Sequence, residues 1–193
     1  YKFLIITTPV GHYYSEPVNV KIERSYTRAA SGGVGRAKAA GNYAASMYPA
    51  LQAQKEGYHQ LVWTDAAEHK YIEESGTMNI VFQIGNKLIT PDENQDTILR
   101  GITKRSVFEI AEKWGVEVEE RMVTVAEIIE AARNGSLKDA FGAGTAATIA
   151  PIAMIGYEDE KFMLPPLEER LLSNKIKKHL VDLKTGRIAD EFG

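Results

Sequence analysis

Short apolar runs and alternating apolar and polar positions recur along the chain, and both patterns predict β-strands. Residues 18–22 alternate, whereas residues 3–6 and 61–63 are continuous apolar runs. The pair Gly85-Asn86 separates two further apolar segments and is a signal for a hairpin turn. The expected strands cover residues 2–8, 18–22, 59–64, 79–84, 87–90, 116–122, 140–143 and 149–157.

Apolar residues three and four positions apart predict four helices among these strands. The first follows Lys38, and Pro49 fits in it only near its start or at a kink. Thr103 is a favourable N-cap for the second helix, and T-x-x-E at 124–127 is a capping box for the third. The fourth covers residues 165–185. The residues that follow the helical spacing in the first helix are Ala44, Met47, Tyr48 and Leu51. Because strands and helices mix without a regular βαβ order, we expect the α+β class.

The composition is that of an ordinary globular domain with a proper core, since 44% of the 193 residues are hydrophobic and 25% are charged. The formal net charge of −3 provides no basic field that would favour nucleic acid. The absence of cysteine excludes disulfides and thiol catalysis and fits a reducing cytoplasm. The four histidines lack metal-ligand spacing, and no apolar run is long enough to span a bilayer. Because Tyr1 is not a methionine and an expected strand follows at once, we expect that the chain was cut from a longer protein.

One lysine stands among small residues in the segment S-G-G-V-G-R-A-K-A-A-G-N-Y, residues 31–43. Glycine allows a ligand to approach the backbone closely, and a desolvated lysine amine is a nucleophile toward carbonyl groups. Lys38 is therefore a candidate nucleophile, with a solvated surface lysine as the alternative. The segment is not a P-loop, because neither Ser nor Thr follows the lysine. It is not a dinucleotide fingerprint either, because Lys38 occupies a position that needs Gly or Ala.

Three further positions carry candidate chemistry. Thr103 follows Gly101 at an expected helix start, where free amides and the helix dipole can bind an anion, with a plain N-cap as the alternative. Thr145 adds a hydroxyl group in a small glycine turn. Glu74 belongs to an acidic pair before Gly76, for which an exposed pair of carboxylates is the alternative.

These pieces occur in a fixed order along the chain. The lysine segment is followed by E-S-G-T-M-N at 74–79, by L-R-G-I-T-K-R-S at 99–106 and by F-G-A-G-T-A-A at 141–147. The set resembles the class IV pyridoxal-phosphate-dependent aminotransferases, and in particular the branched-chain amino-acid aminotransferases. The similarity runs from P-V-G-H-Y-Y at 9–14 to the C-terminus. D-amino-acid aminotransferases and aminodeoxychorismate lyases share the fold and a lysine, and E-S-G-T-M-N favours the branched-chain type.

The resemblance implies a fold and a site. Residues 1–193 would be the larger C-terminal domain of the fold-type IV enzymes, a mixed sheet or pseudo-barrel surrounded by helices, without the N-terminal small domain. Lys38 would form the Schiff base with pyridoxal 5′-phosphate and carry a proton, and Glu74 would keep the pyridine nitrogen protonated. The other cofactor-binding residues would be Arg28, Tyr43, Leu99, Gly101, Ile102, Thr103 and Thr145. The substrate-binding residues would be Tyr13, Thr77, Met78 and Ala146.

The chain departs from the family pattern at several positions. Arg100 and Lys104 stand where the family often has Pro and Arg, and Ser75 replaces a more usual apolar residue beside the catalytic acid. Ala147 and Ala150 occupy the places of a Cys-x-x-Cys switch that some members carry, so this chain has no thiol switch. The arginine that the family's first domain gives to the phosphate would also be missing.

We therefore expect transfer of the amino group of leucine, isoleucine or valine to 2-oxoglutarate by ping-pong kinetics. The enzyme would be a cytoplasmic homo-oligomer that needs no metal, nucleic acid or membrane. A different class IV enzyme acting on another amine and a non-catalytic phosphate-binding module are the alternatives. The chain by itself is expected to be weakly active or inactive, because the other wall of the site would come from the first domain.

Overall fold

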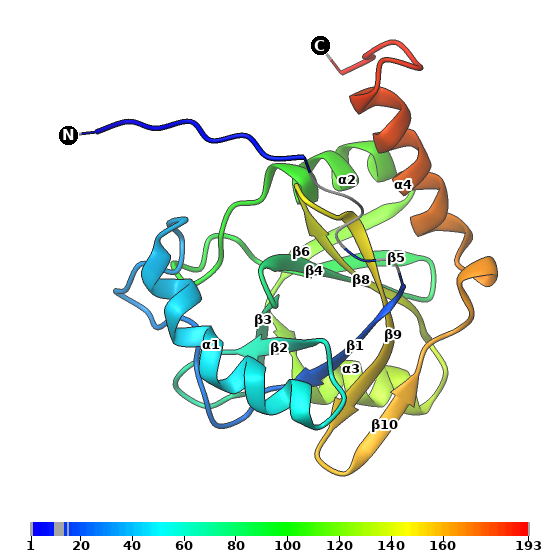
Figure 1. Ribbon diagram of the computed structural model, residues 1–193. Helices are drawn as coiled ribbons and strands as arrows, with labels where there is room; N and C mark the ends of the chain where they lie inside the picture. The colour runs from blue at the N-terminus through cyan, green and yellow to red at the C-terminus, as the bar shows by residue number, and fades with distance from the viewer. Residues whose placement is uncertain (1, 10–13, 15, 193) are drawn as a thin grey trace.

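The computed structural model describes residues 2–9, 14 and 16–192, which form ten strands and four helices (Figure 1). The strands are β1 (Val18–Ile22), β2 (Gln60–Thr64), β3 (Tyr71–Ser75), β4 (Met78–Ile84), β5 (Lys87–Pro91), β6 (Glu117–Arg121), β7 (Val123–Thr124), β8 (Leu137–Gly144), β9 (Thr148–Tyr157) and β10 (Glu160–Met163). The helices are α1 (Ala40–Lys55), α2 (Ile102–Lys113), α3 (Val125–Arg133) and α4 (Leu171–Lys184), with a 3₁₀ turn at Leu167–Glu169.

Six of the strands close into a ring. β4 pairs with both β8 and β3, and the path between those two runs through β9, β1 and β2. β1 is parallel to β2 and β9, whereas the other ring pairs are antiparallel, so the barrel is mixed. β5 and β6 extend the sheet from β4, β7 pairs with β3, and β10 pairs with β9. The α+β class and the barrel surrounded by helices are thus as predicted.

Apolar side chains fill the inside of the ring and the spaces under the helices. All six ring strands contribute to the inner core, and α3 adds Ile128 to it. α2 and α4 pack on the outside through Val107 and Ile176. β4 serves both cores because successive side chains on a strand point to opposite faces: Ile80 belongs to the inner core and Val81 to the outer one.

Residues 2–8 do not form a strand, and that prediction was wrong. The segment extends away from the barrel (Figure 1), and no described strand pairs with it. Its apolar side chains are exposed, Phe3 at 87%. An apolar run is buried as a strand only where it can pair with the edge of a sheet. The described part of this chain has no sheet edge beside residues 2–8.

Helix α1 buries a different face from the one predicted. Pro49 lies inside the helix and is buried, although it was expected only near the start or at a kink. Ala53 packs with Leu61 and Trp63 of β2, so a small side chain faces the sheet. The large apolar residues at helical spacing, Met47, Tyr48 and Leu51, are instead 71%, 58% and 51% exposed.

The last helix begins later than predicted, because Arg170 separates the 3₁₀ turn from α4. Its guanidinium Nη1 lies 3.1 Å from Oδ1 of Asp139 on β8, and both side chains are almost fully buried. The guanidinium also donates to the carbonyl oxygens of Pro165 and Ile152. A buried charge requires such partners, and the break in the helix allows Arg170 to reach them. None of the helices in the described part of the chain is long and apolar enough to cross a membrane.

Candidate active site

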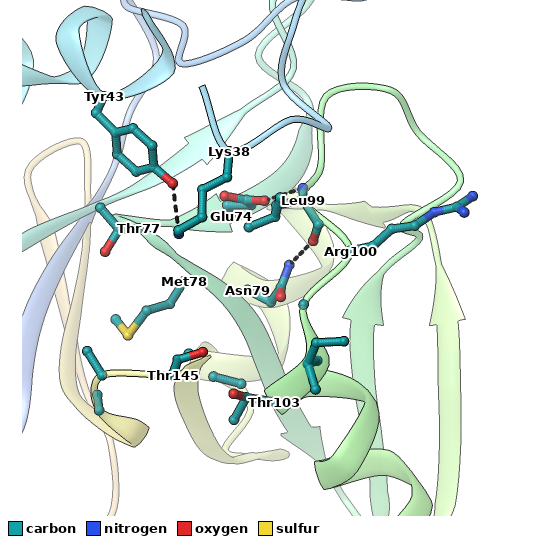
Figure 2. Close-up of a pocket in the computed structure, with 16 residues that line it drawn as sticks. Lys38, Tyr43, Glu74, Thr77, Met78, Asn79, Leu99, Arg100, Thr103 and Thr145 are labelled. Carbon is teal, nitrogen blue, oxygen red and sulfur yellow. Dashed lines mark hydrogen bonds between the residues drawn. The ribbon is translucent and has the colours of Figure 1, made fainter. Parts of the chain in front are cut away.

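Four segments that are far apart in the sequence meet around one cavity of about 630 Å³ (Figure 2). They are the lysine loop (residues 30–38), the β3–β4 turn, the segment leading into α2, and the β8–β9 turn. β3, β4 and β8 are neighbours in the ring, which brings their ends together. The four sequence motifs therefore share one site.

The lysine loop is held from two sides. From α1, Asn42 Nδ2 donates to the carbonyl oxygens of Val34 and Ala37, each at 2.8 Å. From the segment before α2, the Asp96 carboxylate accepts the Gly32 N–H at 2.7 Å. These bonds fix the loop backbone on either side of its tip, so the position of the lysine is set by the fold.

Gly35 lets the lysine loop lie directly on the segment before α2. A Cβ atom at this position would be 2.6 Å from both the Cα and the carbonyl oxygen of Thr97. Real Cβ atoms do not approach backbone so closely, hence any other residue would push the loop away. This contact gives a structural reason for one of the glycines that precede Lys38.

Lys38 directs its amine into the cavity, toward Tyr43 of α1 (Figure 2). Lys38 Nζ donates to the Tyr43 hydroxyl at 3.0 Å. The lysine side chain is exposed and lines the cavity at the same time. Its amine is therefore open to a small molecule and is already held by one hydrogen-bond partner.

Glu74 places a buried carboxylate beside this amine. It is 3% exposed, and its neighbour Glu73 is 2% exposed, so the alternative of an exposed acidic pair is excluded. Glu74 Oε1 accepts the Leu99 N–H at 2.6 Å, and Oε2 lies 3.5 Å from Arg28 Nε. Burial raises the pKa of Glu74 from 4.5 to about 7, while Arg28, the Leu99 amide and Lys38 oppose the rise. Such a group can exchange a proton near neutral pH.

The opposite end of the cavity suits an anion. Helix α2 begins at Ile102 with Gly101 as its N-cap, and no side chain caps the free amides of its first turn. Thr103 is therefore the second helical residue, and the predicted N-cap role for it was wrong. Its hydroxyl and that of Thr145 line the cavity with these amides. Free amides, the helix dipole and hydroxyl groups together form a typical phosphate site.

The side of the cavity between these ends is apolar, with small residues on β8. Met78 is 5% exposed, and its side chain lies against Gly142 and Gly144, where a Cβ atom would be 2.6 Å and 3.0 Å away from it. Thr77 and Ala146 line the same cavity. This wall can receive an aliphatic side chain, with a hydroxyl group nearby.

The structure brings together most of the residues predicted for the site. Arg28 does not line the cavity but lies behind Glu74, where it also donates to the Thr97 carbonyl oxygen. Tyr13 lies outside the described residues. The predicted residues that line the cavity are Lys38, Tyr43, Glu74, Thr77, Met78, Leu99, Gly101, Ile102, Thr103, Thr145 and Ala146.

Three residues that shape the site were not predicted from the sequence. Asn79 lines the cavity, and Asn42 and Asp96 hold the lysine loop. Asn79 ends the motif E-S-G-T-M-N and could have been singled out from it. Asn42 belongs to the lysine segment and could also have been singled out from it, whereas Asp96 lies 64 residues from Gly32 and the sequence carried no signal for that contact.

A lysine amine, a buried acid and an anion site around one cavity of this barrel are the features that the resemblance to the fold-type IV aminotransferases implies. The sequence matches the family described as amino-transferase class IV over residues 1–155, and the chain belongs to that family. Branched-chain-amino-acid aminotransferase 2 of Bacillus subtilis is 42% identical over 100% of this chain. Its match covers 54% of that protein, so the chain spans about half the length of this relative.

Solved structures agree with this assignment. The branched-chain amino acid aminotransferase of Escherichia coli superposes with a TM-score of 0.74 at 25% identity, covering 92% of this chain and 55% of that chain. The branched-chain aminotransferase of Thermoproteus uzoniensis, solved with norvaline, gives 0.72 at 27% identity, covering 89% and 54%. Both share the fold described above.

Proposed function

We propose that this chain is the cofactor-binding domain of a branched-chain amino-acid aminotransferase that uses pyridoxal 5′-phosphate. The observation that carries the proposal is the convergence of Lys38, Glu74 and the uncapped start of α2 around one cavity. The matched relatives named as branched-chain aminotransferases support the substrate class. Membership of the class IV aminotransferases supports the cofactor, which the resemblance implies.

The groups around the cavity fit the cofactor. It has a phosphate, an aldehyde and a pyridine nitrogen, and the residues that line the cavity include an anion site, an amine and an acid that would serve these groups. The phosphate would lie on the amides of Ile102 and Thr103 with the hydroxyls of Thr103 and Thr145. When bound, the cofactor supplies a carbonyl group for amines and an electron-withdrawing ring.

Lys38 is the residue that would attach the cofactor and then move a proton at the substrate. Its Nζ would act as the nucleophile and afterwards as a base. The Tyr43 hydroxyl, at 3.0 Å, orients Nζ and can bond the phenolic oxygen of the ring. One tyrosine thereby positions both partners.

Glu74 would hold a proton at the pyridine nitrogen. Its Oε1 is engaged by the Leu99 N–H, and Oε2 is left beside Arg28 without hydrogen-bond geometry. The pKa of about 7 allows the carboxyl to share a proton with a ring nitrogen at neutral pH. Leu99, on the same segment, would pack on the ring.

The substrate would occupy the apolar side of the cavity. Thr77 and the Ala146 amide would receive its carboxylate, and Met78 would contact its aliphatic side chain. Tyr13, predicted as a second wall of that pocket, stays a prediction. A homo-oligomeric assembly, the cytoplasmic compartment and a first domain that completes the site are also proposals, which follow from the resemblance.

The absorbance of the purified protein with added pyridoxal 5′-phosphate tests the proposal. A band typical of a bound lysine adduct should form, shift when leucine or valine is added, and return with 2-oxoglutarate. D-Alanine should leave it unchanged. A response to D-alanine alone would identify another class IV enzyme. Phosphate binding that Lys38→Ala does not affect, with no band at all, would indicate the non-catalytic phosphate-binding module instead.

A further inference from the structure

The β3–β4 hairpin holds the backbone of one residue in the segment before α2, Leu99, at both its N–H and its carbonyl group. Glu74 and Asn79 are direct partners across the antiparallel strand pair. Glu74 Oε1 accepts the Leu99 N–H at 2.6 Å, and Asn79 Nδ2 donates to the Leu99 carbonyl oxygen at 2.8 Å (Figure 2). Leu99 thus has both of its backbone polar groups bound by side chains of the hairpin.

Asn79 also fills the space above Gly101. An added Cβ at Gly101 would lie 1.9 Å from Asn79 Oδ1 and 3.1 Å from Asn79 Cγ. The next nearest atom is the Cβ of Lys104 at 3.7 Å, an ordinary contact. Gly101 has φ of −81°, which any residue can adopt. The Asn79 side-chain amide is therefore the group that a side chain at the N-cap of α2 would have to displace.

We propose that Asn79 is a positioning residue that fixes the two ends of the cofactor site relative to each other. Through Leu99 it acts on the residue bonded to Glu74, and through Gly101 it acts on the start of the phosphate-binding helix. Asn79 is 5% exposed, so its amide cannot exchange these partners for bulk water without moving. The inference rests on the proposed function, because the two ends matter together only to a ligand that spans them.

A side chain at position 101 and the loss of the Asn79 amide should both break the bond to Leu99 and should therefore weaken cofactor binding in the same way. Alanine at position 101 can be accommodated only if Asn79 swings away, which breaks its bond to Leu99. Once Asn79 is itself alanine, the obstacle is gone and Gly101→Ala should be nearly harmless. The two substitutions should therefore be strongly non-additive, as is expected of residues that act through one contact.

The test is a double-mutant cycle on the dissociation constant for pyridoxal 5′-phosphate, measured by absorbance titration. Asn79→Ala leaves the Leu99 carbonyl unpaired and should weaken binding about tenfold. Gly101→Ala should weaken it by a similar factor, and the double variant should match Asn79→Ala to within about threefold. Asn174→Ala is the matched control, since Asn174 Nδ2 donates to the Leu167 carbonyl at 2.6 Å outside the cavity. It should leave binding unchanged.

Each outcome decides the inference. The inference would be overturned if the fold-changes in the dissociation constant for the two substitutions simply multiply in the double variant. It would also be overturned if Gly101→Ala leaves the dissociation constant of the wild-type background unchanged. Amide hydrogen exchange of Leu99 in the cofactor-free protein provides a second measurement. Asn79→Ala should accelerate it about tenfold, because the bonds of Leu99 open together. Failure of the wild type to bind the cofactor would count against the proposed function, whereas Leu99 exchange tests the positioning role by itself, and unchanged exchange in Asn79→Ala would refute that role.

Discussion

Replacing Glu74 by glutamine should stabilise the cofactor-free protein at neutral and alkaline pH, although it removes the proposed catalytic acid. Glu74 is 3% exposed, and burial raises its pKa from 4.5 to about 7 despite the guanidinium of Arg28 and the Leu99 amide. In the unfolded chain the same carboxyl loses its proton at its ordinary, lower pKa. Glutamine has nearly the same shape, keeps an oxygen for the Leu99 N–H and carries no charge.

The magnitude follows from proton linkage. The folded state binds the proton more tightly than the unfolded state, so the free energy of unfolding falls as the pH rises between the two pKa values. One pKa unit corresponds to about 1.4 kcal/mol. The interval from 4.5 to about 7 therefore amounts to about 3 kcal/mol. The wild type and Glu74→Gln should have similar stability near about pH 4 and differ by about 3 kcal/mol near about pH 8.

Urea unfolding of both cofactor-free proteins across this pH range measures the difference, and the other titrating groups cancel between them. Glu109→Gln, at an exposed position on α2, is the matched control for the loss of one carboxylate. In the loaded enzyme, Glu74→Gln should lower turnover about tenfold to a hundredfold, the range expected for loss of a charge-assisted bond. A stability difference that does not change with pH, or a variant less stable than the wild type at about pH 8, would refute the reasoning.

Two further predictions concern the support of the site. Gly35→Ala should weaken binding of pyridoxal 5′-phosphate about tenfold in an absorbance titration, because its Cβ would collide with the Thr97 backbone and displace the lysine loop. Gly41→Ala, with no atom within 4 Å of the new Cβ, should keep the affinity and raise the stability by about 0.5–1 kcal/mol. Equal affinities in the two variants would count against the loop contact. Arg170→Met should lower the free energy of unfolding by about 3–5 kcal/mol in urea, since it leaves Asp139 buried without its cation; a loss below about 1 kcal/mol would show that this pair does not anchor the start of α4.

The sequence was most informative where several motifs had to serve one chemistry. Lys38, Glu74 and Thr145 were each ambiguous alone, and their order along the chain predicted a shared cavity that the structure contains. Five of the six ring strands were also predicted, because apolar runs and alternation indicate burial on a sheet, whereas β3 was not predicted as a strand. The apolar pattern could not predict that β3 pairs with β4 and closes the ring, because this pairing depends on contacts between strands and not on the sequence of one strand.

The errors have a common physical origin. Residues 3–6 and the residues Met47 and Leu51 are apolar at the expected spacing, yet they are exposed because no described element packs on them. Periodicity indicates which residues can be buried, and the partner decides which of them are. Arg170 interrupts a predicted helix, and its guanidinium pairs with the carboxylate of Asp139 on β8. A local sequence pattern contains no information about this distant partner.

Identifying the lysine that holds the cofactor tests the central claim most directly. The protein would be incubated with pyridoxal 5′-phosphate, reduced with borohydride and digested, and the pyridoxyl mass located by peptide mapping. Lys38→Ala serves as the control and should abolish stable labelling. The label is expected on Lys38, whose amine lies in the cavity beside Tyr43 and Glu74. Labelling spread over Lys55, Lys70 and Lys87, or unchanged in Lys38→Ala, would contradict it.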